Sequence, residues 1–273
     1  MTTTLLIDAD LMAFRAAAGN QDNIDWGDGV VSVSTDIEEA KTKIRRELDQ
    51  WMADLDATDF LICLSDDFKN FRKGIDPTYK GNRTTVERPE LLYVLKDWLY
   101  ESFPSRRVPT LEADDILGIM STEAHQGERI MVSQDKDMKT IPGTLYRPYG
   151  EAPELLVIDR PAADRYHLYQ TLTGDVVDHY PGCPGVGPGK ASAALDSLTG
   201  WEPYTHVFKS GPRKGLEETR WAPRPFDTPW EVLVSLYAKA GLTEAHALVQ
   251  ARLARILRGE DWDGRRPILW SPS

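Results

Sequence analysis

The chain has 273 residues, of which 41% are hydrophobic and 27% are charged, and its 43 acidic against 32 basic residues give a formal net charge of −11. These values are ordinary for a globular protein, exclude a disordered or collagen-like chain, and leave ample length for a sizeable core. The acidic balance argues at first against a nucleic-acid-binding protein, although the decisive question is where the charges lie.

The sequence also excludes several compartments and scaffolds. No apolar run approaches the roughly 20 residues of a membrane span, and the opening residues MTTTLLIDAD lack the basic flank of a signal peptide. The two cysteines, Cys63 and Cys183, have no metal-binding spacing, which excludes a zinc module and a disulfide scaffold. We therefore expect a cytoplasmic protein with no membrane segment.

The first half of the chain alternates between strand and helix patterns. Apolar runs typical of strands cover residues 4–7, 60–64 and 129–132. Helical patterns cover residues 11–18, 36–55, 89–102 and 111–124, with Asp36 as a candidate N-cap and Pro89 at a helix start. An Asp28-Gly29 pair within residues 24–34 predicts a hairpin. This order predicts an α/β fold with a mainly parallel, twisted sheet flanked by helices.

The pattern changes after about residue 160. Helical patterns then dominate, separated by loops rich in glycine and proline, and they cover residues 161–172, 190–198, 229–240 and 243–258. They predict a second, α-helical part packed on the first. Residues 209–224 are basic and predict either an exposed loop or a hairpin.

Acidic residues follow the predicted strands. Asp8 ends the first run, Asp66 follows the second, and Asp135 and Asp137 follow the third. Because ligand sites of open α/β sheets form at the carboxyl ends of the strands, we expect these carboxylates to lie together. A single such aspartate is more often a turn residue or a helix cap, so the argument rests on their number.

Further acids occur in pairs three residues apart. Glu112 and Asp115 share a face of the predicted helix 111–124, whereas Asp114 points elsewhere unless Glu112 lies just before the first turn. Asp175 and Asp178 repeat this spacing. Two carboxylates about 4 Å apart repel by about 4 kcal/mol at an effective dielectric near 20. Divalent ions relieve this repulsion, and oxygen ligands favour Mg²⁺ or Mn²⁺, two of which can catalyse attack on a phosphodiester.

A basic segment lies between two of these acidic strand ends. Residues 69–88 contain only two acidic residues against six basic ones, which are Lys69, Arg72, Lys73, Lys80, Arg83 and Arg88. Phe71 and Tyr79 are interleaved with them. Basic side chains bind phosphates and aromatic rings stack on bases, so the segment predicts a nucleic-acid contact. A solvated charged loop is the alternative.

Residues 182–190, GCPGVGPGK, form a glycine-rich turn with Gly182, Gly185, Gly187 and Gly189, before a helix that has Lys190 in its first turn. Glycines let backbone N–H groups approach an anion, and a helix N-terminus favours phosphate. The spacing is neither a phosphate-binding P-loop nor a dinucleotide fingerprint. It predicts a helix–turn–helix grip on a DNA backbone, with a tight connector as the alternative.

Together these strings resemble a known family. LLIDAD, LSDD…DPTYKGNR, LEADD, SQDKD and TGDVVDHYPGCPGVGPGKA occur in the order found in flap endonucleases and 5′→3′ exonucleases, and FKSGPRKGLEETRW and ARILRGEDW resemble the gene 6-type bacteriophage branch. The resemblance covers nearly the whole chain. It implies a PIN-like nuclease core in residues 1–160 with a basic arch at about 67–90. It also implies a helical region in 161–273, with a helix–three-turn–helix DNA clamp at about 164–198.

The resemblance also implies roles for individual residues. A first metal would use Asp8, Asp66, Glu112, Asp114 and Asp115 in some combination, and a second would use Asp135, Asp137, Asp175 and Asp178. Catalysis would rest on Asp135, Asp137, Lys80 and Arg83, the last two at the scissile phosphate. DNA would be bound by Lys69, Arg72, Lys73, Tyr79, Lys80, Arg83, Gly185, Gly187, Gly189 and Lys190. Asp10 matches no family role.

The expected activity is therefore metal-dependent 5′→3′ hydrolysis of double-stranded DNA, with flap cleavage and removal of RNA from RNA–DNA hybrids. The cofactors would be two Mg²⁺ or Mn²⁺ ions, with K⁺ at the glycine turn. The protein would act as a monomer in the host cytoplasm during phage DNA replication, recombination and host DNA breakdown. A catalytically inactive DNA-binding module and a PIN-type ribonuclease are the alternatives.

Overall fold

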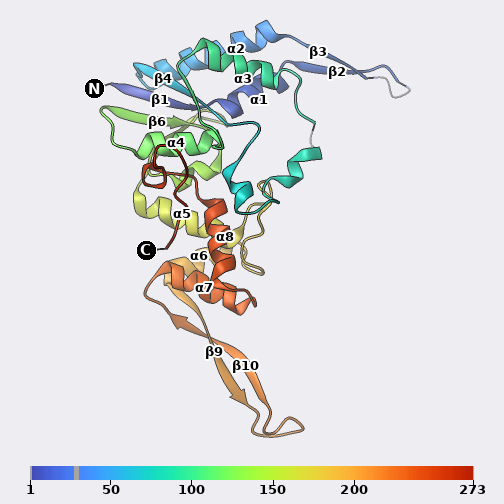
Figure 1. Cartoon of the computed structure of the whole chain (residues 1–273), viewed down its shortest axis with the longest axis vertical. Coiled ribbons are helices and arrows are strands. Elements are labelled where there is room, and N and C mark those ends of the chain that lie inside the picture. The colour runs from blue at the N-terminus through green and yellow to red at the C-terminus, as the bar shows by residue number, and fades with distance from the viewer. Residues whose placement is uncertain (1, 28–30, 86, 273) are drawn as a thin grey trace. The chain divides into compact units, whose positions relative to one another are not determined.

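The central feature of the computed structural model, which describes residues 2–27, 31–85 and 87–272, is a six-stranded sheet (Figure 1). Its strand order is β5-β4-β1-β6-β7-β8, and every neighbouring pair is parallel except β7 with β8. The strands are β1 (Thr3–Asp8), β4 (Asp59–Leu64), β5 (Ser105–Arg107), β6 (Glu128–Val132), β7 (Gly143–Arg147) and β8 (Glu154–Ile158). The predicted α/β class with a mainly parallel sheet is confirmed.

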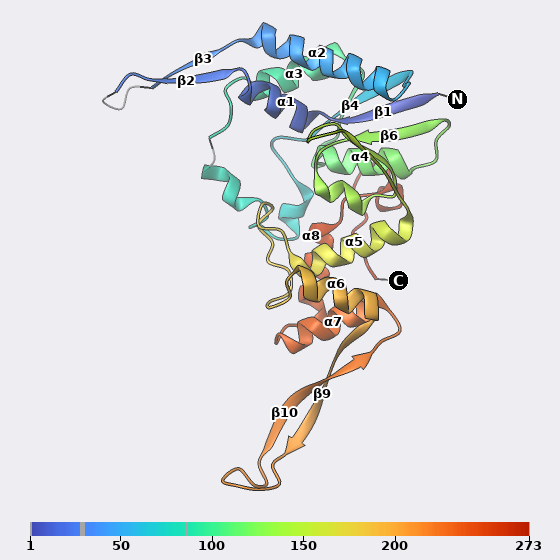
Figure 2. The ribbon, with the colours of Figure 1, turned by 180° about the vertical axis from the view of Figure 1, so that it is seen from behind.

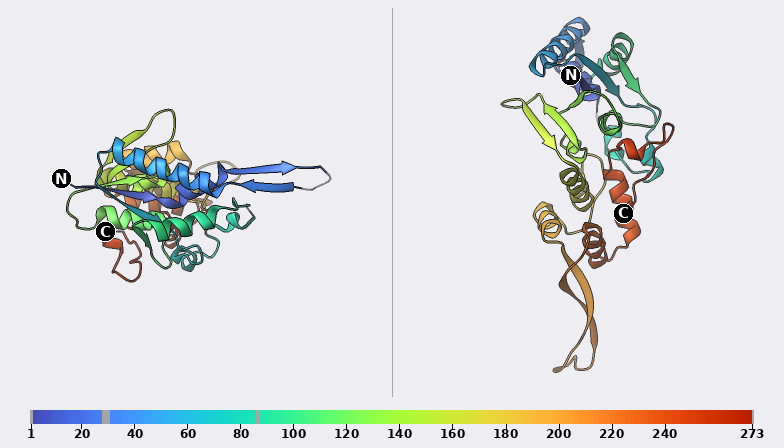
Figure 3. Two further views of the ribbon diagram at one scale, coloured as in Figure 1. Left: turned by 90° about the horizontal axis from the view of Figure 1, so that it is seen from above. Right: turned by 90° about the vertical axis from the view of Figure 1, so that its left-hand side faces the viewer.

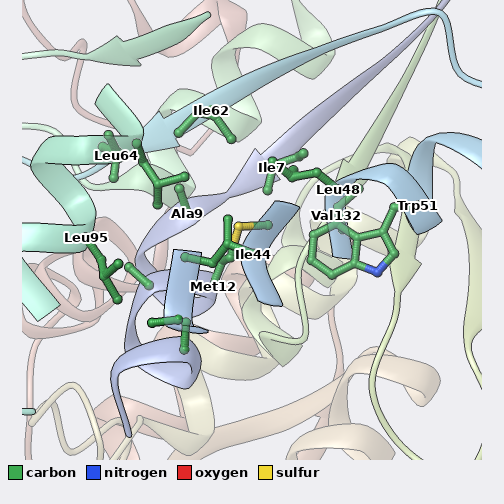
Figure 4. Close-up of a cluster of buried hydrophobic side chains, with 14 of the residues drawn as sticks. Ile7, Ala9, Met12, Ile44, Leu48, Trp51, Ile62, Leu64, Leu95 and Val132 are labelled. Atoms are coloured by element: carbon green, nitrogen blue, oxygen red, sulfur yellow. The ribbon is translucent and has the colours of Figure 1, made fainter. Parts of the chain in front are cut away.

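Alternate side chains of the sheet enter two different cores. Leu5 and Ile7 of β1 face one core, together with residues from α1 (Ala9–Ala18), α2 (Ile37–Asp54) and α3 (Leu92–Ser102) (Figure 4). Leu6 faces the other core, with α4 (Ala113–Thr122) and Leu257. Period-two alternation with both faces apolar is what a covered parallel sheet requires.

The helix starts follow local capping chemistry. The Asp36 carboxylate accepts the Glu39 N–H at 2.9 Å, which confirms it as the N-cap of α2. The helix predicted from Pro89 begins later, at Leu92, and the Pro89 carbonyl accepts the Leu92 N–H. The predicted hairpin forms between β2 (Gln21–Asp25) and β3 (Val31–Thr35), while its Asp28-Gly29 turn lies outside the described residues (Figure 3).

The chain divides into two compact units. The first comprises residues 1–71, 85–163 and 256–268, and the second comprises residues 72–84, 164–255 and 269–273. The second unit contains α5 (Arg160–Thr173) for most of its length, α6 (Pro188–Ser197), α7 (Pro229–Lys239) and α8 (Glu244–Ala254), as the helical patterns predict. The helix expected over 243–258 ends earlier, because the Leu257 N–H is taken by the Asp115 carboxylate in the first unit.

A long ribbon in the second unit escaped the sequence prediction. Strands β9 (Thr199–Val207) and β10 (Glu217–Pro225) pair antiparallel over nine positions each, so the hairpin alternative for the basic stretch is correct and begins ten residues earlier (Figure 2). The described part of the chain also contains four short 3-10 helices, at Phe71–Gly74, Gly81–Thr85, Lys136–Thr140 and Gly259–Asp261. Among the described residues no helix is both long and apolar enough to cross a membrane.

Candidate functional site

The carboxyl ends of β4, β1 and β6 lie side by side at one edge of the sheet. Asp8, the last residue of β1, is in register with Cys63 of β4, and Ile7 is in register with Val132 of β6. The residues that follow these strands, Ser65-Asp66 and Ser133 to Asp137, therefore extend from the same edge. The structure places the strand-end acids where the sequence predicts them.

Asp8 is the buried centre of this edge, with 7% of its surface exposed. Burial, together with the neighbouring charges of Asp10 and Asp135, raises the pKa of its carboxyl to about 7 against two opposing hydrogen bonds. Those bonds come from the Ser133 hydroxyl at 2.7 Å and the Leu11 N–H at 3.2 Å. The side chain is thus crowded by like charge, an environment that a cation would relieve.

Ser133 connects two of the predicted ligands, and sequence reasoning missed it. Its hydroxyl donates to Asp8 and accepts the Asp135 N–H at 3.1 Å, while its own N–H binds the Tyr146 carbonyl of β7. The Asp135 carboxylate in turn accepts the Asp137 N–H at 2.8 Å and so starts a 3-10 turn. A serine directly after a buried strand and two residues before the first acid is the signal that could have revealed it.

Asp66 anchors a loop at the end of β4. Although burial raises the pKa of its carboxyl, hydrogen bonds from the Thr110, Phe68 and Lys69 N–H groups outweigh burial and lower it. Asp66 is therefore ionised at neutral pH and ties the end of β4 to the loop before α4.

The acids at the start of α4 divide into two roles. Glu112 is the N-cap of α4 and lies just before its first turn. This is the arrangement in which the sequence analysis allows Asp114 to point toward the other acids. The charge of Asp114 joins those of Asp8 and Asp10 in raising the pKa of the Cys63 thiol, whose main cause is burial. These carboxylates therefore surround the end of β4.

Asp115, expected as a metal ligand, lies instead in the protein interior. It has no exposed surface, and its two oxygens accept the Glu112 N–H and the Leu257 N–H, both at 3.1 Å. The carboxylate joins the start of α4 to the C-terminal segment of the first unit. Buried oxygens engaged by backbone donors serve packing and orientation.

A buried lysine supplies positive charge beside the acidic edge. The Lys96 ammonium, on a side chain that is 4% exposed, pairs with Asp10 at 2.9 Å and with Asp67. Asp10, which matches no family role, also accepts the Ser65 N–H at 3.3 Å. Lys96 lies among the core-facing residues Leu92, Leu95 and Leu99 of α3, and a charged residue in an apolar stripe is a signal for a buried counter-ion.

The donor atoms at this edge are carboxylate and hydroxyl oxygens, the ligands that hard divalent ions prefer. Within residues 2–27, 31–85 and 87–272, no three His, Cys, Asp or Glu side chains are grouped closely enough to hold a metal ion. The Asp8 carboxylate, buried and surrounded by other negative charges, is the position at this edge whose charge a divalent cation would balance.

In the second unit, both predicted phosphate-binding cations contact a predicted metal ligand. The Asp178 carboxylate pairs with the Arg83 guanidinium at 2.6 Å and the Lys80 ammonium at 3.4 Å, and it accepts the Tyr79 hydroxyl at 2.8 Å. The Lys80 N–H also binds the Asp178 carbonyl, with Lys80 in the left-handed region at φ +54°. Asp175 is buried and accepts the Val177 and Asp178 N–H groups.

The rest of the basic segment has two kinds of residue. Lys69 and Lys73 are exposed, as a DNA contact requires. Arg72 and Tyr79 are 2% exposed, which corrects their expected place on a DNA-binding surface. The Arg72 guanidinium donates to the Leu253 and Arg255 carbonyls at 3.1 and 2.6 Å, so this arginine fixes the segment to the end of α8 within the second unit.

Some glycines of the glycine-rich turn are required by the fold, and others are not. A Cβ at Gly182, where φ is +66°, would collide with the backbone of Leu172 and Gly174. A Cβ at Gly187 or Gly189 would meet no atom within 4 Å, whereas Gly185 has equal space but a φ of +75° that favours glycine. Gly187 is the N-cap of α6, and the Lys190 ammonium donates to the Gly185 carbonyl at 2.9 Å. The open side of the turn can therefore receive a ligand close to the backbone.

Comparison with known proteins gives this geometry its context. Residues 3–145 match the model of the 5′-3′ exonuclease N-terminal, resolvase-like domain. The chain is 31% identical to an exonuclease of Escherichia phage T7, over 98% of this chain and 93% of the relative. It is 30% identical to an exodeoxyribonuclease of Enterobacteria phage T3, over 98% and 92%.

Solved structures agree at the level of the fold. A phage T5 5′-exonuclease with bound zinc ions has a TM-score of 0.53 at 16% identity, covering 92% of this chain and 93% of its own. A phage T5 flap endonuclease in complex with DNA and metal ions has a TM-score of 0.55, with 92% and 88% covered. Sequence, fold and the acidic sheet edge agree, and the chain belongs to the 5′-3′ exonuclease family of nucleases.

Proposed function

We propose that the protein is a metal-dependent 5′→3′ exonuclease acting on double-stranded DNA. The proposal rests on the Asp8 carboxylate, which is buried near other negative charges at the edge where three parallel strands end. The phage T7 and T3 relatives are named exonuclease and exodeoxyribonuclease, which supports DNA as the substrate. Flap cleavage and removal of RNA from hybrids belong to the same proposal, as do roles in phage DNA replication, recombination and host DNA breakdown.

Two Mg²⁺ or Mn²⁺ ions would be held by carboxylates from two groups that total nine acids. The first group comprises Asp8, Asp66, Glu112, Asp114 and Asp115, in which Asp115 would hold the start of α4 in place and the other four would face the ion. The second comprises Asp135, Asp137, Asp175 and Asp178. When bound, such ions stabilise charge on phosphodiester oxygens and lower the pKa of water. Ser133 orients Asp8 and the backbone of Asp135, which limits the freedom of both carboxylates before any ion binds.

The second unit would hold the DNA. Lys80 and Arg83 are oriented by Asp178 and would donate to non-bridging phosphate oxygens, neutralising the charge that develops during hydrolysis. Exposed Lys69 and Lys73 would contact the single-stranded 5′ end. Gly187, Gly189 and Lys190 would meet the duplex backbone, with K⁺ held by turn carbonyls that the Lys190 ammonium leaves open. The proposed division is a nuclease core in residues 1–160 and a DNA-binding region in 161–273, in a cytoplasmic monomer.

The test is replacement of Asp135 and Asp137 by asparagine. The variant should cut a 5′-labelled duplex at least a hundredfold more slowly in Mg²⁺, because these carboxylates would hold an ion rather than build the core. It should still bind the duplex as tightly as the parent protein or more tightly. Cleavage is followed on gels with duplex, 5′-flap and RNA–DNA hybrid substrates, each with Mg²⁺ and with chelator.

The matched control replaces Asp22 and Asp49, two exposed acids remote in sequence from the strand ends, by asparagine. It makes the same charge change and should cut at the parental rate. Parental rates in a folded Asp135→Asn, Asp137→Asn variant would refute the assignment. Cleavage confined to RNA would instead support a ribonuclease.

A further inference from the structure

The β9–β10 ribbon is the largest feature of the second unit that the proposed function leaves without a role (Figure 1). Its base is anchored in the core of the unit. Gly200 is buried, the Trp201 N–H donates to the Ser235 hydroxyl of α7 at 3.0 Å, and the Phe226 N–H donates to the Leu198 carbonyl. The ribbon therefore starts from a fixed position two residues after the end of α6.

Beyond this base the described side chains of the ribbon are exposed or half-buried, and none is buried. Residues 202–205 of β9 are all exposed, and Tyr204 and Val207 keep 45% and 44% of their surface. Directly opposed residues, such as Tyr204 and Arg220, share a face. An isolated two-stranded ribbon is marginally stable in water, so a nine-residue ribbon exposed on both faces indicates a surface that a partner covers.

The tip has a strong local charge. Residues 208–216, FKSGPRKGL, contain Lys209, Arg213 and Lys214 and no acidic residue, in a chain with a net charge of −11. Lys209 and Lys214 make no side-chain hydrogen bond or ion pair with any residue that the structure describes. Arg213 lies 4.0 Å from the centre of the Phe208 ring and 3.5 Å from Glu218.

The tip is also ordered by its own hydrogen bonds. The Lys214 N–H donates to the Gly211 carbonyl, the Leu216 N–H to the Arg213 carbonyl, and the Gly215 N–H to the Phe208 carbonyl. Gly211 and Gly215 have φ values of +75° and +85°, which their missing side chains allow. Positive charges on an ordered turn bind a polyanion with a smaller loss of conformational entropy than charges on a loose loop.

We propose that the β9–β10 ribbon is a second duplex-DNA contact, which lies along a groove and places Lys209, Arg213 and Lys214 against phosphates. The major groove of B-DNA admits a two-stranded β-ribbon. Lys209 and Lys214, which make no ion pair with the described residues, match a polyanion, while Arg213 also contacts Glu218 and the exposed Val207 and Leu216 are the apolar side chains nearest to the tip. The inference rests on the proposed function, since α6, which leads into the ribbon, begins at the glycine turn proposed to hold duplex.

The length of the ribbon fixes how much duplex it can use. Nine residues at about 3.3 Å each extend roughly 30 Å, close to one helical turn of B-DNA. The ribbon should therefore matter for duplexes that continue about one turn beyond the segment held at the glycine turn, and it should be irrelevant for shorter ones.

The test compares the parent protein with a Lys209→Ala, Lys214→Ala variant, both in the Asp135→Asn, Asp137→Asn background so that DNA stays intact during binding. Fluorescence anisotropy measures affinity for 10- and 30-base-pair duplexes over a range of salt concentrations. For the longer duplex, the variant should bind about tenfold more weakly, and its slope of log affinity against log salt should shrink by about two. For the shorter duplex, the two proteins should be equal.

Two controls separate the possible causes. Lys43→Ala with Arg46→Ala removes the same charge from the exposed side of α2 and should leave binding unchanged, whereas Lys209→Arg with Lys214→Arg should retain it. Equal affinity and equal slopes for the tip variant, when the unmutated protein cuts DNA and the Asp135→Asn, Asp137→Asn background binds it, would overturn the role of the ribbon alone. The role would also be overturned if the tip variant bound poly-glutamate more weakly than the parent but bound duplex equally well. The tip would then contact an acidic protein and not DNA. A parent that neither cuts nor binds duplex would overturn the proposed function and the ribbon's role together.

Discussion

At the scale of single residues, the carboxylates at the acidic edge differ in how their negative charge is compensated. Asp10 has a buried counter-ion in Lys96, and Asp66 has three backbone N–H donors. Asp8 has two hydrogen bonds, yet burial and the charges of Asp10 and Asp135 dominate and raise the pKa of its carboxyl. The protein therefore neutralises the acids that shape the loops and leaves Asp8 dependent on a proton or a cation.

This difference predicts a pH-dependent effect of Asp8→Asn on stability. The pKa of Asp8 is about 7 in the folded protein against an ordinary value of 3.8, so between these values the folded state holds a proton that the unfolded state releases. The parental free energy of unfolding therefore falls as pH rises through this window. Asparagine has no proton to lose, so its advantage over the parent should grow by on the order of 2 kcal/mol between pH 5 and pH 8 and should vanish only below about pH 4.

Urea unfolding in the presence of chelator at the two pH values measures the effect. Glu47, which is half-buried and has a raised pKa but lies on α2 beside Tyr149, offers a control in Glu47→Gln. Adding Mg²⁺ at pH 8 should stabilise the parent and leave Asp8→Asn almost unchanged. If the two proteins differed in stability by the same amount at both pH values, the fold would not raise the pKa of the Asp8 carboxyl.

The sequence predicted where the acids lie but not what holds them. Asp8, Asp66 and Asp135 follow apolar runs, and the parallel-sheet rule alone brings such positions to one edge. Ser133 and Lys96 stayed hidden, because their roles depend on tertiary contacts over 125 and 29 residues of sequence. The burial of Arg72 was equally invisible, since its acceptors are carbonyls at the end of α8.

At the scale of elements, long periodic helices were predicted well and short strands were not. Strand β5 has three residues, SRR, and carries no apolar run, whereas β8 (ELLVI) carries a run of four apolar residues that the sequence analysis did not assign to a strand. The β9–β10 ribbon carries no alternating pattern because neither face is buried beyond its base. Periodicity reports burial, and elements that are short or exposed give little signal.

The glycine turn yields a prediction that separates folding from binding. Gly189→Ala should leave thermal stability unchanged or raise it slightly, because no atom lies within 4 Å of the new Cβ and alanine favours the first turn of α6; Gly187→Ala, at the N-cap, should lower it only slightly. Each should weaken duplex binding about tenfold, because the methyl group occupies the space proposed for a phosphate. Gly182→Ala should instead lower the melting temperature, since its Cβ meets the backbone of α5.

Thermal melting and anisotropy on the same samples decide between the two uses of glycine. Unchanged binding by the stable Gly187→Ala and Gly189→Ala proteins would make the turn a simple connector. Melting and binding that fall together would mean that the fold itself needs these glycines.

At the scale of the whole molecule, the net charge of −11 is compatible with a DNA-binding protein. Nine of the 43 acids are assigned to the proposed metal groups, which leaves 43 − 9 = 34 acids against 32 bases. Positive charge is concentrated locally, at the exposed lysines of the segment 69–88 and at the ribbon tip. Self-repulsion among the clustered acids should destabilise the metal-free protein, and ions that bind only the folded state should offset it.

The metal groups therefore predict a large, specific thermal shift. Saturating Mg²⁺, at about a hundred times its dissociation constant, should stabilise the parent by about 2.7 kcal/mol, or roughly 5 to 10 °C in melting temperature. NaCl at equal ionic strength controls for general screening of the acidic chain and should raise the melting temperature much less. Asp135→Asn with Asp137→Asn should lose a large part of the Mg²⁺ shift while keeping the NaCl shift. If Mg²⁺ and NaCl shifted both proteins equally, the acids would act only through net charge, and the two-metal assignment would fail without any assay of cleavage.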